Sequence, residues 1–373
     1  MAVTFLPDEI IINILARLPA NSLVRFRCVS KYWHCMLMEP YFMNLRSRKG
    51  IILPINKEYL HFIDVDNNNY TTFKRRYPLE YSTGARVIGS FNGLVLMVTL
   101  NEYFTLNAFV LYNPFTGEFK KLLDPPTQII SCKSGFGFGY GGTTPTEDLK
   151  IVKFTSCRDI CEVYDFKTNS WSSQSSKKYD INCITFAYPV GTFSNGNLYW
   201  IRSEHVLLAF GVKDMVLSEI VLPRGSNFIG DIGTINGCLC ALKMTTSSKF
   251  ELWVMNDVDS TWANTHSFTL DLKWDIFYHT LNIFDDGKIL MVNPFSQLII
   301  YDVSKSSYET LNISFPKHFH RFFKKNCVQF VETLVSPLDV CFSRWGGREK
   351  KSKQDKMKNL LMQCFNLIDY NVI

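Results

Sequence analysis

Residues 162–171 read EVYDFKTNSW, and this stretch decides the fold of the larger part of the chain. A short apolar segment ends at Asp165, a polar turn follows, and Trp171 belongs to another short segment. Short runs rich in Val, Tyr and Trp and bounded by turn residues are typical of β-strands. The stretch therefore predicts two strands joined by a tight turn.

The same pattern, an apolar pair followed by a turn residue, recurs along the chain. Its six instances are Phe62-Ile63-Asp64, Leu111-Tyr112-Asn113, Val163-Tyr164-Asp165, Ala209-Phe210-Gly211, Val254-Met255-Asn256 and Ile300-Tyr301-Asp302. Successive third positions lie 49, 52, 46, 45 and 46 residues apart. One four-stranded propeller blade takes roughly 40 to 50 residues. The repeat therefore predicts an all-β, propeller-like domain of about six units.

Tight-turn signals come before four of these instances, each followed by an apolar segment. They are Asn92-Gly93, Asn195-Gly196, Asn236-Gly237 and Asp286-Gly287. Such pairs supply the positive φ angles that a two-residue hairpin requires. We expect a hairpin turn at each of them.

The first 45 residues have helical periodicity instead. A helix begins at Pro7 and stops at Pro19, Asn21 and Ser22 offer N-caps for a second helix, and Ser30 offers one for a third. Three short helices bury too little surface to be stable alone, so their surplus of large apolar residues needs a partner or the next domain. Physical reasoning leaves both alternatives open.

This N-terminal unit resembles an F-box almost position for position. The matching residues are Leu6-Pro7, Ile14-Leu15, Arg17-Leu18-Pro19, Ser22-Leu23, Arg25-Phe26-Arg27-Cys28-Val29-Ser30-Lys31, Trp33 and Pro40-Tyr41-Phe42. The resemblance implies three helices that dock on a Skp-type adaptor and, through it, on a cullin. The adaptor surface or its direct support is then Leu6, Pro7, Ile10, Ile14, Leu15, Leu18, Pro19, Leu23, Phe26, Val29 and Trp33. The sequence does not separate the two roles for each residue.

The remainder resembles the F-box-associated region found behind F-boxes in large plant families, and also a degenerate kelch repeat. The motifs are Ser90-Phe91-Asn92-Gly93-Leu94, Asn113-Pro114-Phe115-Thr116-Gly117, Phe136-Gly137-Phe138-Gly139-Tyr140, Glu162-Val163-Tyr164 with Thr168-Asn169-Ser170-Trp171, Leu252-Trp253-Val254-Met255, and Phe330-Val331-Glu332-Thr333-Leu334. The pollen S-locus F-box proteins share this layout. The resemblance implies about six degenerate kelch-like blades, with the Phe330 to Leu334 strand closing the ring.

These observations divide the chain into three parts. We expect an F-box at 1–45, an F-box-associated β-propeller-like substrate-binding domain at 50–342, and a basic tail at 343–373 that is disordered or a short amphipathic helix.

The sequence gives little support for a catalytic, metal or phosphate site. The Gly-rich run Phe136–Gly142 leads into a strand and not into a helix, so strand glycines are favoured over a phosphate site. Cys157 with Cys161 and Cys238 with Cys240 lack a second ligand pair at zinc spacing, and His318 with His320 lack a third ligand. We predict no catalytic residue, no metal and no cofactor.

The composition indicates which cellular compartment and which classes of partner to expect. Eleven cysteines without a secretory signal favour reduced thiols and a cytoplasmic or nuclear location. Of the net charge of +6, the tail 343–373 holds +4, so the body is nearly neutral and no nucleic-acid surface is predicted. No run of about 18 uncharged apolar residues indicates a membrane span.

The function implied by the resemblance is that of a receptor. The F-box would hold the chain on a cullin ligase, and the β domain would present an unknown protein substrate for ubiquitination. An F-box scaffold that acts outside a ligase and, less favoured, a propeller enzyme are the alternatives.

Overall fold

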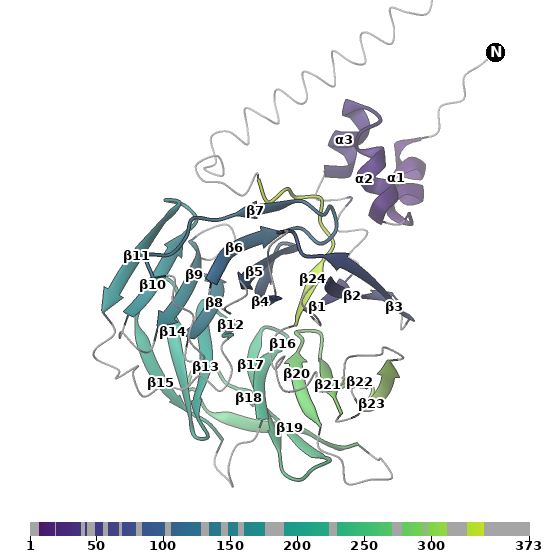
Figure 1. The fold of residues 1–373 in the computed structure, drawn as a ribbon. Helices are drawn as coiled ribbons and strands as arrows, with labels where there is room; N and C mark the ends of the chain where they lie inside the picture. The colour runs from purple at the N-terminus through teal and green to yellow at the C-terminus, as the bar shows by residue number, and fades with distance from the viewer. Residues whose placement is uncertain are drawn as a thin grey trace, which may run out of the picture.

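The computed structural model describes residues 7–18, 20–38, 42, 49–54, 59–66, 69–79, 84–100, 106–127, 134–142, 148–155, 160–175, 190–223, 230–270, 278–293, 295, 297–311 and 327–338. Within these ranges, three N-terminal helices precede six four-stranded sheets (Figure 1). Figure 1 shows the sheets following one another around a ring. The architecture is a small helical unit followed by a six-bladed propeller, which confirms the predicted fold class.

The helices are α1 (Asp8–Ala16), α2 (Ala20–Phe26) and α3 (Lys31–Met38). The predicted cap of α3 is confirmed, because the backbone N–H of Trp33 donates to Oγ of Ser30 at 3.1 Å. The predicted caps of α2 are wrong, since Asn21 and Ser22 lie inside that helix. Only residues 17–19 separate α1 from α2, so the second helix begins before either polar side chain is reached.

Each blade is an antiparallel sheet, here given from the innermost strand outwards. Blade 1 comprises β24 (Val328–Val331), β1 (Lys49–Pro54), β2 (Tyr59–Asp66) and β3 (Asn69–Arg76). Blade 2 comprises β4 (Gly84–Phe91), β5 (Leu94–Leu100), β6 (Leu106–Tyr112) and β7 (Phe119–Lys121). Blade 3 comprises β8 (Ser134–Tyr140), β9 (Leu149–Thr155), β10 (Ile160–Asp165) and β11 (Ser170–Ser175).

The second half of the ring repeats this order. Blade 4 comprises β12 (Thr192–Ser194), β13 (Asn197–Ser203), β14 (Val206–Gly211) and β15 (Leu217–Val221). Blade 5 comprises β16 (Gly230–Ile235), β17 (Cys238–Met244), β18 (Lys249–Met255) and β19 (Trp262–Thr269). Blade 6 comprises β20 (His279–Ile283), β21 (Lys288–Val292), β22 (Leu298–Asp302) and β23 (Ser307–Leu311).

Strand β24 closes the ring by pairing with β1 from the other end of the chain, with Ile51 opposite Gln329 and Lys49 opposite Val331. The predicted closing strand is therefore present, but it ends at Val331 and not at Leu334. The chain leaves the sheet there, because the Thr333 carbonyl accepts a hydrogen bond from the Asn113 side chain of blade 2 at 3.0 Å.

All six repeat instances lie on the third strand of a blade or at its end. The predicted turn residue of the first instance, Asp64, lies inside β2 opposite Thr71, so the prediction of a turn there is wrong, whereas in four others the turn residue has a structural role. Asn113, Asp165, Asn256 and Asp302 each accept a backbone N–H from the turn that follows, at 2.7 to 3.0 Å. Such side chains replace backbone partners that a tight turn leaves unpaired. Where the repeat has Gly211, the Asp214 carboxylate performs this role for the N–H of Val216.

Three of the predicted hairpins are confirmed. Asn92-Gly93, Asn195-Gly196 and Asn236-Gly237 have positive φ at both residues, between +46° and +78°, and each joins the two innermost strands of a blade. The fourth turn is different, because Ile283 pairs with Ile289 and only Gly287 of the residues between them has positive φ. Residues 284–287, four in all, connect β20 to β21, so the expected hairpin forms there but not as a two-residue turn.

Large apolar side chains fill the spaces between neighbouring blades. Strand β8 has glycines because it lies close to blade 4, where a Cβ at Gly137 would meet the Leu198 side chain at 2.7 Å and one at Gly139 would meet the Phe193 ring at 2.3 Å. Gly137 and Gly139 are therefore strand glycines, as the sequence favoured, and Gly141 and Gly142 follow the end of β8. No described helix is long and apolar enough to cross a membrane.

Candidate functional site

Helix α1 has two apolar faces. Leu15 is 2 % exposed and packs in a cluster with Leu23, Leu37 and the partly buried Ile11. Ile10 and Ile14, one helical turn apart, are 44 % and 50 % exposed. The arc of apolar residues in the sequence therefore divides into an inner face, which forms the core of the helical unit, and an outer face.

Helices α2 and α3 contribute to the same core. Leu23 is fully buried, and the Phe26 and Trp33 rings meet edge to face with centroids 5.3 Å apart. Val29, in the turn between the helices, is 64 % exposed. Helix α3 is also tied to α1, because the Tyr32 hydroxyl donates to the Asp8 carboxylate.

The predicted adaptor residues thus fall into three groups. Exposed residues are Pro7, Ile10, Ile14 and Val29. Residues buried or partly buried in the helical core are Leu15, Leu18, Leu23, Phe26 and Trp33. Leu6 and Pro19 lie outside the described residues.

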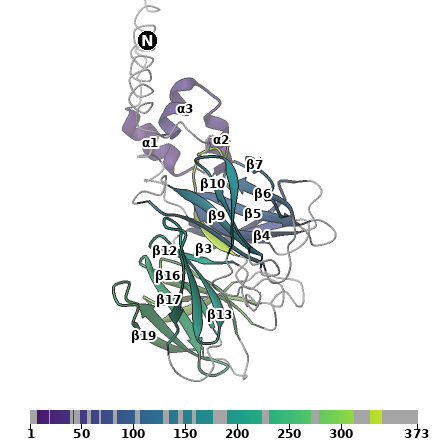
Figure 2. The ribbon, with the colours of Figure 1, turned by 90° about the vertical axis from the view of Figure 1, so that its left-hand side faces the viewer.

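The helical core extends into the propeller. Phe115, from the turn between β6 and β7, and Leu334, just beyond β24, are buried in the same cluster as Leu15 and Leu23. Figure 2 shows the helices at one end of the molecule, beyond the blades. The sequence contains a signal for this contact in the Asn113–Gly117 turn motif, but its spacing predicts only a turn.

Polar contacts hold the same junction. The Arg27 guanidinium lies 2.5 Å from the Glu118 carboxylate, and both side chains are partly buried. Burial raises the pKa of Glu118, but hydrogen bonds from Arg27 and Ser336 and the Arg27 charge outweigh it, so the pKa lies below its ordinary value. Asn113 donates to the carbonyls of Thr333 and Val335 at 3.0 and 2.7 Å, which fixes the segment that carries Leu334.

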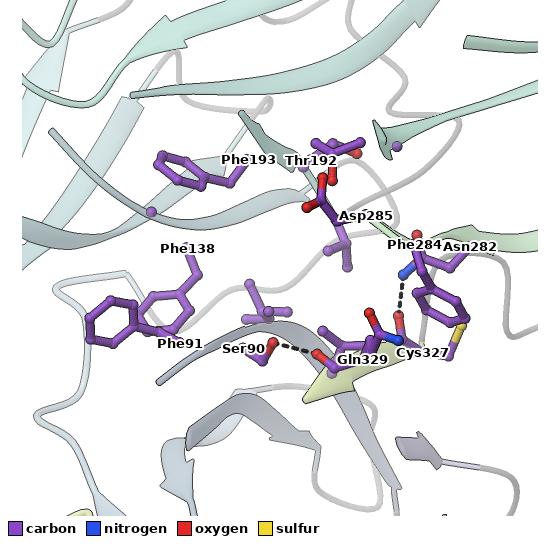
Figure 3. Close-up of a pocket in the computed structure, with 18 of the residues that line it drawn as sticks. Ser90, Phe91, Phe138, Thr192, Phe193, Asn282, Phe284, Asp285, Cys327 and Gln329 are labelled. Atoms are coloured by element: carbon purple, nitrogen blue, oxygen red, sulfur yellow. Dashed lines mark hydrogen bonds between the residues drawn. The ribbon is translucent and has the colours of Figure 1, made fainter. Parts of the chain in front are cut away.

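A second candidate site is the central channel of the propeller. A cavity of about 320 Å³ is lined by residues of, or next to, all six innermost strands. Figure 3 shows Phe91, Phe138 and Phe193 on one side of it and Asp285 and Gln329 on the other. Its lining combines aromatic rings with a few polar groups, as ligand sites commonly do.

Of the cysteines and histidines singled out in the sequence, the structure describes Cys161, Cys238 and Cys240. Cys161 and Cys240 are buried in β10 and β17, and burial raises the pKa of the Cys161 thiol. Cys157, His318 and His320 lie outside the described residues, as does the whole tail 343–373. In the part of the chain that the structure describes, no three His, Cys, Asp or Glu side chains are grouped to hold a metal.

Comparisons with known proteins agree with this architecture. The family described as F-box domain matches residues 4–44, and the family described as F-box associated beta propeller domain matches residues 65–337. F-box protein CPR1 of Arabidopsis thaliana is 23 % identical, over 83 % of this chain and 84 % of the relative. F-box/kelch-repeat protein At3g17530 of the same plant is 24 % identical, over 80 % and 81 %.

Among solved structures, the Cps50 (Swd1) β-propeller domain of Myceliophteria thermophila is 9 % identical and superposes with a TM-score of 0.42, covering 71 % of this chain and 84 % of that one. The matched families span both parts of the chain, and the observed three helices and six blades fit them. The chain belongs to the family of F-box proteins that carry an F-box associated β-propeller domain.

Proposed function

We propose that this protein is the substrate-recognition subunit of a Skp/cullin/F-box ubiquitin ligase. The F-box would bind the Skp-type adaptor, the propeller would bind a protein target, and a separate enzyme would transfer ubiquitin. The receptor contributes by holding the target near that enzyme, because proximity raises the effective concentration of the reacting groups. The chain itself is a non-catalytic subunit in this proposal.

The observation that carries the proposal is the outer face of the F-box. Ile10, Ile14 and Val29 expose large apolar side chains on a unit whose inner face is already filled by its own core and the propeller. Neighbouring exposed apolar side chains mark surfaces that bind another protein. We assign Pro7, Ile10, Ile14 and Val29 to direct adaptor contact, and Leu15, Leu18, Leu23, Phe26 and Trp33 to its support.

The proposal places the protein in the cytoplasm or nucleus. Cys161 and Cys327 are buried free thiols, which suits a reducing compartment. Direct localisation of the tagged full chain tests this part separately.

Co-purification of the full chain with a Skp-type adaptor and a cullin tests the ligase assignment. The variant to use is Ile10→Asp with Ile14→Asp, because both side chains are exposed and the substitution leaves the helical core intact. An acid at Leu15 would unfold the F-box and decide nothing. The matched control is Val258→Asp, at an apolar side chain 94 % exposed in the turn after β18.

We expect the wild type and the control to retain adaptor and cullin, and the Ile10/Ile14 variant to lose both. Recovery of the adaptor without the cullin would identify an F-box scaffold that works outside a ligase. Equal recovery with the Ile10/Ile14 variant would refute the assigned surface, and no recovery with any folded protein would refute the ligase function.

A further inference from the structure

The channel cavity has an aromatic wall that spans three blades. The rings of Phe91 and Tyr140 have centroids 6.0 Å apart, and those of Tyr140 and Phe193 are 4.6 Å apart. All three residues are only partly buried and line the cavity. Aromatic faces carry negative electrostatic potential, so they attract cations as well as apolar groups.

Asp285 supplies a fixed negative charge to the same cavity. Its Oδ1 accepts the N–H of Gly237 at 2.7 Å, and its carbonyl accepts that of Asn236 at 3.0 Å, so the β16–β17 turn of blade 5 holds this blade 6 residue in place. Among the described residues, no basic side chain forms a salt bridge with Asp285. Asp286 differs, since it lies 3.6 Å from the Lys49 ammonium and 3.9 Å from that of Lys288.

The cavity and the F-box lie at the same end of blade 2. Strands β4 and β6 both pair antiparallel with β5, so they end at the same end of the blade. Ser90 and Phe91, the last residues of β4, line the cavity. Phe115, which follows β6, contacts the F-box. A ligand at this mouth would therefore be held on the F-box side of the propeller.

We propose that this channel mouth binds a basic side chain, Lys or Arg, of a protein ligand. The aliphatic stem would lie along the rings of Phe91, Tyr140 and Phe193, and the charged end would pair with Asp285. A carboxylate without a basic partner disfavours phosphates and nucleic acids, whereas a cation gains from both the charge and the rings. The inference rests on the proposed receptor function only in taking the ligand to be the ligase target.

The probes are three blocked tripeptides, Gly-Arg-Gly, Gly-Lys-Gly and Gly-Gln-Gly, titrated into the full chain with isotope-labelled isoleucine methyl groups. Ile88 and Ile283 line the cavity and report binding by NMR. We expect at least one basic peptide to change the chemical shifts of both methyl groups in a saturable way. The affinity for the glutamine peptide should be lower than that for the basic peptide by roughly tenfold or more. Equal affinity for all three peptides, or no shift of the cavity methyl groups, would overturn the proposal.

Asp285→Asn removes the charge and keeps an oxygen for the Gly237 N–H. We expect this variant to bind the basic peptide with roughly tenfold lower affinity. Phe193→Leu should lower the affinity for the same peptide several-fold. The matched control is Asp259→Asn, at an exposed carboxylate that accepts the Thr261 N–H in the outer turn of blade 5 and should leave binding unchanged. Unaltered binding with Asp285→Asn would refute the assigned site. Adaptor co-purification does not involve the cavity, so the two proposals can fail independently.

Discussion

Lys153 and Glu162 form an ion pair that is completely buried in blade 3. They face each other across β9 and β10, with the ammonium 2.7 Å from the carboxylate. Thr127, in the chain after β7, donates its N–H and its hydroxyl to Glu162 at 2.8 and 2.6 Å. Lys153 donates to the Thr127 hydroxyl at 2.7 Å and also to its carbonyl. The network therefore ties blade 2 to blade 3 through polar contacts inside an apolar interface.

Glu162→Gln should be strongly destabilising, because it leaves the buried ammonium without its counter-charge. We expect a loss of about 3–5 kcal/mol in the free energy of unfolding, measured by urea titration. Lys153→Met should also be costly, and the double variant should cost clearly less than the two losses together. Additive losses would contradict the role of the pair.

His61, in β2, makes stability depend on pH. Burial and, secondarily, the charge of Lys74 opposite it in β3 lower the pKa of His61 from 6.5 to about 4. Between these values the unfolded chain binds the proton and the folded chain does not, so the folded state loses stability as the pH falls from about 6.5 towards 4. The urea midpoint of the wild type should therefore fall between about pH 7.5 and pH 5 by more than that of His61→Gln. An equal fall in both proteins would refute this assignment.

The Asn-Gly turns show how one local element is used in two tertiary settings. Gly237 has φ of +78°, and a Cβ added there would meet no other atom within 4 Å. Gly93 has φ of +77°, but a Cβ there would lie 2.3 Å from the Val331 carbonyl and 2.7 Å from the Thr333 Cβ. The second turn thus packs against the segment that closes the ring.

Alanine at these two positions should separate the cost of the turn from the cost of the contact. Gly237→Ala should lose about 1–2 kcal/mol of unfolding free energy, the cost of a left-handed conformation with a Cβ. Gly93→Ala should lose clearly more, since it also pushes β24 away from blade 2. Urea unfolding of both variants gives the comparison, and equal losses would show that the contact at Gly93 is unimportant.

At the scale of the whole molecule, the F-box and the propeller share one core. Phe115 and Leu334 come from two distant parts of the propeller, and the Arg27–Glu118 pair lies beside them. In the proposed receptor role such a junction would be useful, because a fixed orientation would keep the target within reach of the transferring enzyme.

Leu334→Ala should loosen this junction without opening the ring. Leu334 is 1 % exposed, and removing a buried leucine side chain costs about 2–5 kcal/mol. Hydrogen exchange of the α1–α3 amides should become faster, while exchange in blade 5 stays unchanged. The control is Leu338→Ala, four residues further on and 61 % exposed. Unchanged protection of the helices would refute a shared core.

The sequence by itself predicted about six blades, from a repeat of 45 to 52 residues, and three short N-terminal helices. The blade prediction depends on short-range interactions, namely side chains such as Asp165 that accept N–H groups of the next turn, and Asn-Gly pairs with positive φ. The helix prediction depends on apolar periodicity and on Pro7 and Pro19. Helix caps were less predictable, since Asn21 and Ser22 are suitable residues placed one turn too late.

Only the tertiary structure decided which F-box residues face outwards and which lie inside. Ile14 and Leu15 are adjacent and equally apolar, and they differ because Phe115 and Leu334 help to bury one face of the unit. The channel cavity likewise joins residues from 88 to 329, brought together by closure of the ring. Local patterning specifies strands, turns and helices, whereas contacts between residues hundreds of positions apart follow from how those elements pack.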